Sequence, residues 1–248
     1  VVTGVSRRVG IGRAVALRLA ELGADLFIHS WSAFDADRPW GADAGGVEAI
    51  LAELRAMGRR AEHLAADFRD PAAPAHVVEA AAAALGPLDI LVANHSYSVP
   101  GALEDLTAEA IDAHMEVNVR GSLLLVKAFA ACHDDTRPGG RVVLMTSGQH
   151  LGAMPGTLAY IASKGALHHL TRSLAAHLAP RGITVNCVNP GATDTGWATP
   201  AVHEAVLARA PMGRWGTPDD AARLIAWLAT DDARWITGQV IDSTGGGM

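Results

Sequence analysis

Apolar residues follow two alternating patterns along this chain. Short apolar runs, typical of buried strands, alternate with stretches in which apolar residues return every three or four positions, as on one face of a helix. The strands predicted in this way are Val1–Val2, Leu26–Ile28, Glu62–Ala66, Leu88–Val92, Arg141–Met145, Gly182–Val188 and Gln239–Ile241. The predicted helices are Ile11–Leu22, Val47–Met57, Asp70–Leu85, Ile111–Ala131, a helix that holds Tyr160 and ends near Leu178, and Asp219–Ala229.

Two segments lack both patterns. Phe34–Gly46 is rich in Asp, Gly, Pro and Trp and is predicted to be an irregular insertion. Thr193–Thr217 is predicted to be a loop with a short helix near Val202–Ala208. Because strands and helices alternate throughout without a repeat or a linker, the fold class is predicted to be α/β. We expect a single domain over residues 1–248, with a doubly wound parallel β-sheet and helices on both faces.

Composition and charge limit the classes of function. The net charge of -6 argues against nucleic acid or an anionic membrane as the main partner. No apolar run reaches the roughly 18 residues that suggest a membrane span. Cys132 and Cys187 fit neither a disulfide framework nor a metal site, so we expect inert thiols in the reducing cytoplasm and no bound metal. Val1 reads as the end of a strand, so residues are expected to be missing before it.

A glycine-rich turn joins the first predicted strand to the first predicted helix. Gly4, Gly10 and Gly12 let the backbone approach a ligand, and the helix N-terminus offers unpaired N–H groups, which together suit a pyrophosphate. No carboxylate follows the second strand near Ser30, where an acid would bind the ribose 2′-hydroxyl of NAD. Arg7 and Arg8 in the turn favour the 2′-phosphate of NADP(H). NAD(H) stays open, since two arginines also suit a solvated loop.

Tyr160 and Lys164 lie four residues apart in a predicted helix and therefore share one face. A phenol has an ordinary pKa of about 10, so acid–base work near neutral pH needs about 4 kcal/mol in favour of the phenolate. An ammonium about 6 Å away supplies about 2.8 kcal/mol at an effective dielectric constant of about 20. We therefore predict that Lys164 lowers the pKa of Tyr160. The alternative for so short a pattern is an ordinary helix surface.

In their order and spacing these motifs resemble the short-chain dehydrogenase/reductase family over nearly the whole chain. The matching residues are Thr3-Gly4, Gly10-Ile11-Gly12, Asp67, Asn94, Asn118, Ser147, Tyr160, Lys164, Pro190-Gly191 and, as in 3-oxoacyl reductase-like members, Gly213–Pro218 and Ile236–Gln239. The resemblance implies a Rossmann fold and NAD(P)-dependent hydride transfer between a nicotinamide and a carbonyl or secondary alcohol of a small molecule.

The resemblance also implies roles for individual residues. Tyr160 would be the acid or base, Ser147 would bind the substrate oxygen, and Lys164 would also hold the nicotinamide ribose. Asn118 would bind a water of a proton relay, or else be a satisfied core amide. Asp67 would accept the adenine amino group. The implied cofactor-binding residues are Gly4, Ser6, Arg7, Arg8, Gly10, Ile11, Gly12, Ser30, Asp67, Phe68 (against the adenine ring), Asn94, Tyr160, Lys164, Pro190, Gly191, Thr193 and Thr195.

Two departures from the family pattern stand out. Five residues separate Gly4 from Gly10, where the family has three, and the family's Asn-Asn-Ala-Gly reads Ala93-Asn94-His95-Ser96. His95 is expected to line the substrate pocket or to be structural. The predicted substrate pocket consists of His95, Gln149, His150, Met154, Trp197 and the loop at 193–217.

Two other kinds of function stay open. One is a dinucleotide-binding sensor without turnover, and the other is a different chemistry of the same family, such as that of a polyol, sugar or steroid-type alcohol dehydrogenase. The resemblance implies a homotetramer or a dimer, formed through the helices at 103–131 and 157–178 and the last strand.

Overall fold

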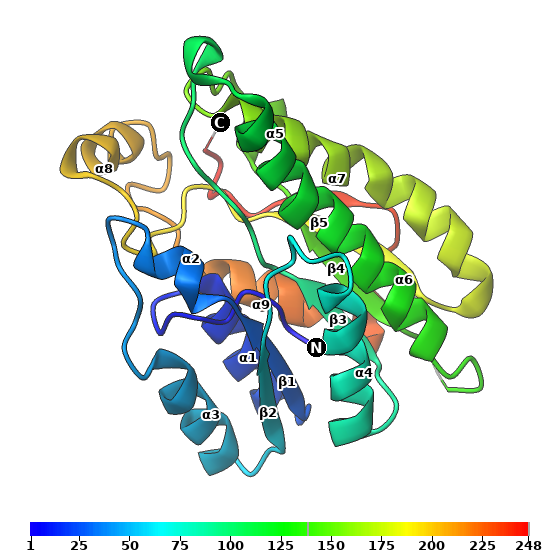
Figure 1. Cartoon of the computed structure of the whole chain (residues 1–248). Helices are drawn as coiled ribbons and strands as arrows, with labels where there is room; N and C mark the ends of the chain where they lie inside the picture. Colours follow the sequence, from blue (N-terminus) through cyan, green and yellow to red (C-terminus); the bar gives the residue numbers. More distant parts are fainter. Residues whose placement is uncertain (138, 248) are drawn as a thin grey trace.

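A parallel β-sheet with helices on both faces forms the middle of the molecule, as Figure 1 shows for this computed structural model. The structure describes residues 1–137 and 139–247. The strands are β1 (Leu26–Ser30), β2 (Ala61–Ala65), β3 (Ile90–Ala93), β4 (Arg141–Met145), β5 (Thr184–Asn189) and β6 (Val240–Asp242). The fold class predicted from the sequence is confirmed.

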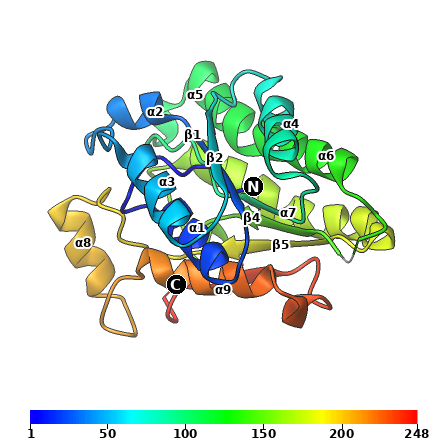
Figure 2. The same ribbon diagram turned by 90° about the horizontal axis from the view of Figure 1, so that it is seen from below.

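Two layers of helices cover the sheet. The helices are α1 (Ile11–Glu21), α2 (Ser32–Ala36), α3 (Gly46–Ala56), α4 (Ala73–Leu85), α5 (Ala108–His114), α6 (Ser122–Cys132), α7 (Leu158–Leu178), α8 (Pro200–Leu207) and α9 (Pro218–Leu228). On one face α1 packs against α9, and on the other α4 packs against α6, with α7 beside β4 and β5 (Figure 2). No described helix has the length and apolar character needed to cross a membrane.

The strand order of the sheet reverses at Val2, which lies between β1 and β3. Val2 pairs with Ile28 of β1 on one side and with Val92 of β3 on the other, through N–H···O bonds such as Val2 to Phe27 at 2.9 Å. From there the sheet runs outward to β2 on one side and through β4 and β5 to β6 on the other. In such sheets ligands bind where the strand order reverses, at the carboxyl ends of the strands. Thr3 and Gly4 lie at that point.

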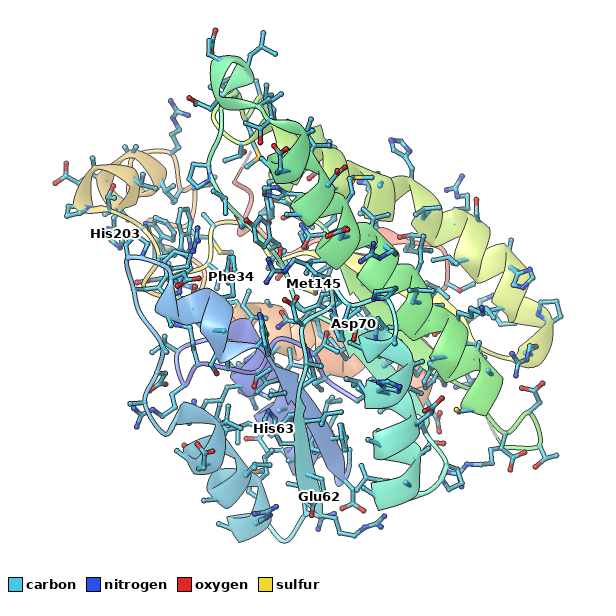
Figure 3. The ribbon with its side chains drawn as sticks, in the orientation of Figure 1. Phe34, Glu62, His63, Asp70, Met145 and His203 are labelled. Carbon is cyan, nitrogen blue, oxygen red and sulfur yellow. The ribbon has the colours of Figure 1, made fainter. Side chains whose placement is uncertain are left out.

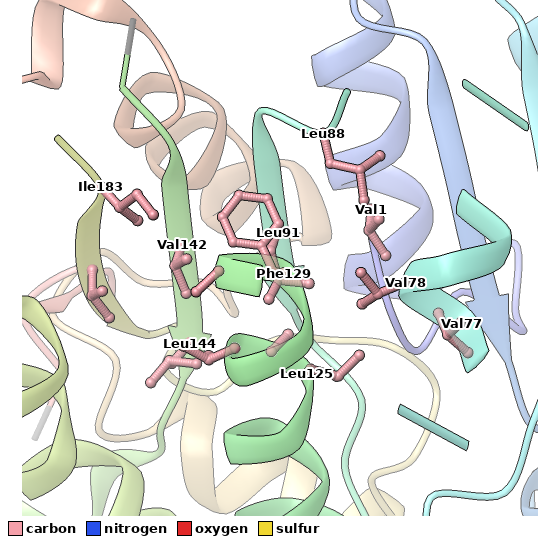
Figure 4. Close-up of a cluster of buried hydrophobic side chains, with 14 of the residues drawn as sticks. Val1, Val77, Val78, Leu88, Leu91, Leu125, Phe129, Val142, Leu144 and Ile183 are labelled. Carbon is pink, nitrogen blue, oxygen red and sulfur yellow. The ribbon is translucent and has the colours of Figure 1, made fainter. Parts of the chain in front are cut away.

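The sheet separates two apolar cores. β1, β4 and β5 are buried along their whole lengths, as expected for strands covered on both faces. One core lies under α4, α6 and α7 and includes Leu125, Phe129 and Leu144, which Figure 4 shows packed together. The other lies under α1 and α9. Full burial of such a side chain contributes about 1.5–3 kcal/mol, so both cores hold the strand ends firmly in place.

Three segments differ from the sequence-based expectation. The helix predicted over Ile111–Ala131 begins at Ala108, ends at Cys132 and contains a π-helical turn over Met115–Gly121. The insertion predicted to be irregular over Phe34–Gly46 begins inside the short helix α2, which ends at Ala36. The loop at 193–217 carries α8, as predicted, and its two ends are joined by the Asp194 N–H, which donates to the Gly216 carbonyl at 2.9 Å.

Candidate active site

Tyr160 and Lys164 point into the same volume from the first turns of α7. The Lys164 ammonium lies 5.7 Å from the centroid of the Tyr160 ring and is only 2% exposed. Its Nζ donates a hydrogen bond to the Met145 carbonyl at 3.1 Å, and the Thr146 hydroxyl donates to the Lys164 carbonyl at 2.9 Å. The end of β4 therefore fixes both the backbone and the side chain of Lys164.

Burial shifts the pKa values of both groups. Burial raises the pKa of Tyr160 above its ordinary value, and the hydroxyls of Ser147 and Ser96 offset only part of this rise. Burial lowers the pKa of Lys164 to about 8. The expectation that Lys164 would bring the pKa of Tyr160 below its ordinary value is wrong for the protein alone. The spacing of the two residues shows the charge of Lys164 but does not show how deeply the fold buries the phenol, and burial opposes formation of the phenolate.

Asn118 lies in the π-helical turn and is fully buried. Its Oδ1 accepts from the Tyr97 N–H at 2.7 Å, and its Nδ2 donates to the Tyr97 carbonyl and to Ser163 Oγ, both at 2.9 Å. Ser163 in turn donates to the Tyr160 carbonyl at 2.7 Å. Both N–H groups of the Asn118 amide are thus used within the protein. The side chain matches the alternative of a satisfied core amide that joins the π-turn to α7.

Glycines shape the turn before α1. Gly4 has φ +71°, and a Cβ on Gly12 would lie 2.4 Å from the Gly4 carbonyl oxygen. Asn94, after β3, donates from Nδ2 to the carbonyls of Thr3 and Gly4 at 3.0 and 3.1 Å. The N-cap residue Gly10 has no side chain to cap the first N–H groups of α1, which begins at Ile11. These N–H groups stay available for an anion such as a pyrophosphate.

The two arginines of this turn have different partners. Arg8 forms a bidentate ion pair with Asp43, with the shortest distance 2.6 Å, and this pair lowers the pKa of Asp43 to about 2. Arg7 donates from Nη2 to the Thr195 carbonyl at 2.9 Å, and its guanidinium lies 5.4 Å from the centroid of the Trp40 ring. Arg7 therefore joins the glycine-rich turn to the loop at 193–217, while the charge of Arg8 is compensated.

An acid does lie near this turn, contrary to the sequence-based expectation. The Asp35 carboxylate on α2 is buried and accepts a hydrogen bond from the Ser6 hydroxyl at 2.5 Å. The position expected for such an acid is directly after β1, whereas the turn of α2 brings Asp35 back from further along the chain. The Ser30 hydroxyl is buried and pairs with His63 Nε2 at 2.8 Å.

Two expected ligand contacts are wrong because the side chains are buried. Phe68 is 3% exposed and stacks on His29 with a centroid distance of 4.1 Å, so its ring is not available to an adenine. His95 is 6% exposed and lies between Thr3 Oγ1, at 2.7 Å from Nδ1, and the Val117 carbonyl, at 3.1 Å from Nε2. Burial holds the pKa of His95 well below its ordinary value. His95 is structural and does not line a pocket.

The remaining cofactor candidates lie at the carboxyl ends of β2 and β5. Asp67 pairs with Arg69 at 2.6 Å and keeps part of its carboxylate exposed. Gly191, after Pro190, has φ +66°, and a Cβ there would lie 2.9 Å from Thr244 Cα. The hydroxyl of the buried Thr193 donates to the Pro190 carbonyl at 3.0 Å.

The predicted pocket residues come from two segments. Gln149 and His150 lie in a short turn after Ser147, where Gln149 Nε2 donates to Thr146 Oγ1 at 3.1 Å and His150 Nε2 lies 3.0 Å from Asp242. Met154 is half-buried in the loop that follows. Trp197 donates from Nε1 to the Thr193 carbonyl at 3.1 Å and lies edge-on to Trp215.

A row of aromatic rings was not anticipated from the sequence. Phe34 on α2 contacts Tyr97 at a centroid distance of 5.1 Å, Tyr97 contacts His114 at 4.8 Å, and His114 lies 6.4 Å from Tyr160. Figure 3 draws the side chains and labels Phe34. No local pattern connects these positions, which meet only through the fold. The row links the insertion to the phenol of Tyr160.

A surface cavity of about 430 Å³ lies apart from Tyr160 and the residues around it. It is lined by α1, the start of α9 and the turn at Arg8–Gly10, and it does not include Ser147, Tyr160 or Lys164. This cavity therefore borders the glycine-rich turn and not the phenol of Tyr160.

Comparisons with known proteins cover the whole length of the chain. The model of a family described as "Enoyl-(Acyl carrier protein) reductase" matches residues 4–247. The "Uncharacterized oxidoreductase YjdA" of Bacillus subtilis is 42% identical over 246 residues, which are 99% of this chain and 94% of the relative. The chloroplastic "NADPH-dependent aldehyde reductase-like protein" of Arabidopsis thaliana is 37% identical over 254 residues, with 99% and 92% covered.

Two solved structures are similar in fold as well as in sequence. A short-chain dehydrogenase from Burkholderia cenocepacia, in complex with NADP, has a TM-score of 0.88 and 39% identity, with 99% of this chain and 95% of the other covered. A blue fluorescent protein from a metagenomic library, in complex with NADPH, has a TM-score of 0.87 and 36% identity with the same coverage.

Proposed function

The chain belongs to the short-chain dehydrogenase/reductase family, and from this premise we propose that it interconverts a carbonyl and a secondary alcohol with a nicotinamide cofactor, in the manner of a 3-oxoacyl reductase. The observation that carries the proposal is the convergence of Tyr160 and Lys164: the Lys164 ammonium lies 5.7 Å from the centroid of the Tyr160 ring and is fixed to Met145 at the end of β4, which Ser147 follows. A phenol, a neighbouring hydroxyl and a buried ammonium at the carboxyl ends of β4 and the first turns of α7 suit proton exchange with a substrate oxygen.

NADP(H) is the cofactor we propose, with NAD(H) as the alternative. The uncapped start of α1 and the glycines packed against Asn94 suit the pyrophosphate. Arg7 is the better candidate for a 2′-phosphate, because the charge of Arg8 is compensated by Asp43. The NADP and NADPH complexes of the two similar structures support this choice. Asp35 beside Ser6 is the observation that keeps NAD(H) open.

Each residue of the site has its own role in the proposed reaction. The bound nicotinamide supplies or accepts the hydride. Burial keeps the phenol of Tyr160 protonated at neutral pH, so that it is ready to donate a proton to a carbonyl oxygen. With a pKa of about 8, Lys164 stays cationic at neutral pH, and its charge stabilises the phenolate that Tyr160 becomes after donating its proton. Ser147 would donate a hydrogen bond to the substrate oxygen.

The substrate proposed is a small molecule with at least one polar group, bound near Gln149, His150, Met154 and Trp197. Gln149 Oε1 supports a polar contact, because it is buried without a hydrogen-bond partner among the described residues. The nearest alternative for the reaction is the chemistry of a polyol, sugar or steroid-type alcohol dehydrogenase. We also propose that the protein forms a homotetramer or a dimer.

A cofactor titration followed by a substrate panel tests the function. NADPH and NADH are titrated first, and the preferred one is then mixed with 3-oxoacyl thioesters, simple ketones, keto sugars and ketosteroids while its absorbance is followed. Consumption with one class supports an oxidoreductase and identifies the substrate class. Tight binding without consumption of any member contradicts the proposal and favours a sensor.

A further inference from the structure

Both neighbours of Arg7 are fixed to the insertion that follows β1. The Ser6 hydroxyl donates to the Asp35 carboxylate at 2.5 Å, and the Arg8 N–H donates to Asp43 Oδ2 at 2.8 Å. These positions belong to the stretch between the first two glycines of the turn, which is two residues longer here than in the family pattern. The backbone of Arg7 is therefore held on both sides, and this determines where its half-buried side chain leaves the turn.

The Arg7 guanidinium contacts an indole ring and a carbonyl oxygen. Its Cζ lies 5.4 Å from the centroid of the Trp40 ring, and Trp40 is itself fixed, because its Nε1 donates to Asp35 Oδ1 at 3.0 Å. A guanidinium held over an aromatic face keeps N–H groups available at its edge. One of them, on Nη2, donates to the Thr195 carbonyl at 2.9 Å. The side chain thus reaches from the glycine-rich turn to the loop at 193–217.

Thr195 lies where the chain enters the body of the loop at 193–217. The next residue, Gly196, has φ +76°, and its N–H donates to Asp194 Oδ1 at 3.0 Å, which defines a tight turn. This turn leads directly to Trp197, one of the predicted pocket residues. The position of the Thr195 carbonyl therefore determines where the Trp197 side chain lies.

The body of this loop has a small core of its own. Trp215 is 6% exposed and packs against Trp197 and His203 of the same loop, with centroid distances of 5.9 and 5.0 Å. α8 has no buried residue, and no described residue of the loop belongs to the two cores of the sheet. The second leg of the loop is tied to α9, where Arg214 donates to Asp220 at 2.7 Å. The placement of the loop thus depends on how its two legs are held.

We propose that Arg7 is a positioning residue for the substrate, because through the Thr195 carbonyl it sets where Trp197 and α8 lie relative to Tyr160. The inference rests on the proposed function, in which the loop borders the substrate. A guanidinium has five N–H donors, so the bond to Thr195 leaves others for an anion bound at the glycine-rich turn. One side chain therefore couples the cofactor turn to the loop.

Hydrogen exchange of the cofactor-free protein tests this link without any substrate. Arg7→Met keeps the apolar stem and removes every N–H donor. The backbone N–H groups of Asp194, Gly196 and Gly216 form hydrogen bonds at the base of the loop. Their exchange is expected to become about tenfold faster, which corresponds to the loss of one hydrogen bond to a charged group.

Two further variants separate the link from a general effect of charge. Arg7→Lys keeps a cation that can donate to a carbonyl, so it should restore part of the protection of these N–H groups. Arg13→Met is the matched control, because it removes a charge from α1 that pairs with Glu53 at 2.7 Å, and it should leave exchange in the loop unchanged.

Kinetics measure the consequence for the substrate. At saturating cofactor, Arg7→Met should raise the KM for substrate about tenfold and change kcat less than about twofold, because the loop is displaced while Tyr160 and Lys164 are untouched. Arg7→Lys should give an intermediate KM. A loss of kcat with an unchanged KM, or faster exchange spread equally over α1, α9 and the loop, overturns the inference.

The exchange experiment also separates this inference from the proposed function. Loop exchange in Arg7→Met that matches both wild type and Arg13→Met overturns the inference, whether or not turnover is found. Faster exchange confined to the loop, in a protein that turns over no substrate, supports the link made by Arg7 and contradicts only the proposed reaction.

Discussion

The hydroxyl of Tyr160 is the atom on which the proposed chemistry depends. Tyr160→Phe removes this atom and keeps the ring that contacts His114. We expect kcat to fall by about 10²–10⁴-fold, the usual contribution of a positioned acid or base, with cofactor affinity nearly unchanged. Steady-state kinetics and a cofactor titration measure both quantities. Tyr97→Phe is the matched control, and near-normal turnover of Tyr160→Phe on every active substrate would contradict the assignment.

The buried charge of Lys164 has a cost in stability. Its pKa is about 8 in the folded protein, against an ordinary value of 10.5. Below pH 8 both the folded and the unfolded state carry the charge, and the folded state bears the full cost of burial. Between pH 8 and 10.5 the folded state releases its proton first, so stability rises with pH.

Lys164→Met should therefore stabilise the protein while abolishing turnover. At pH 7 we expect the free energy of unfolding to rise by about 1–3 kcal/mol, because removing the buried charge outweighs the loss of the hydrogen bond to Met145. Thermal or urea denaturation at pH 7 and pH 10 measures the difference between variant and wild type, which should shrink at the higher pH. A variant that is less stable at pH 7, or a difference independent of pH, would show that the charge is not costly.

At the scale of single residues, contacts between neighbours in one helix could be predicted from the sequence. The convergence of Tyr160 and Lys164 follows from helical spacing alone. The direction of the Tyr160 pKa shift did not follow, since it depends on burial by distant segments. The adenine contact of Phe68 and the pocket alternative for His95 failed for the same reason, because the stacking and hydrogen-bond partners of these side chains come from β1, the first strand segment and the π-turn.

At the scale of elements, the start of α9 connects the substrate loop to the core. The Thr217 hydroxyl accepts from the Asp220 N–H at 3.3 Å, and the Asp220 carboxylate accepts from the Thr217 N–H at 2.7 Å, which forms a capping box. α9 buries Ala222 and Ile225 against the sheet. Fraying at Thr217 therefore weakens packing that the whole fold needs.

Thr217→Ala should lower the free energy of unfolding by about 1 kcal/mol, the usual cost of losing an N-cap hydroxyl. Thr199 caps α8 in the same way, through the Val202 N–H at 3.3 Å, but α8 has no buried residue. We expect Thr199→Ala to change global stability by less than about 0.5 kcal/mol, because α8 frays without disturbing the core. Urea denaturation measures both, and equal effects of the two substitutions would contradict this account.

Most elements followed from periodicity, and the exceptions have physical reasons. A π-turn shifts the helical register over a few residues, which a period of 3.6 does not reveal, and Met115–Gly121 was read as ordinary helix. α2 is too short to show a period, so Asp35 was missed as a neighbour of Ser6.

At the scale of the whole molecule, the sheet brings together segments that are far apart in the chain. The strand order reverses at Val2, so the glycine-rich turn lies beside the ends of β1 and β3. This arrangement was predictable, because the alternation of strands and helices allows few topologies and places the odd polar residues at the carboxyl ends. The link from Arg7 to Thr195 was not predictable, since it spans most of the chain without a local signal.

The proposed self-association is the largest-scale prediction, and the surface offers a way to test it. The segment at 103–131, one of the helical segments named from the family resemblance, exposes Leu103 at 70%, Ile111 at 41% and Met115 at 37%. Light scattering should give the mass of a dimer or tetramer. Replacing Ile111 and Met115 together by Glu should lower that mass, because burying two carboxylates in an apolar contact is unfavourable. Leu22→Glu, at an exposed position after α1, should not, and a wild-type protein that is monomeric at all concentrations would rule out the association.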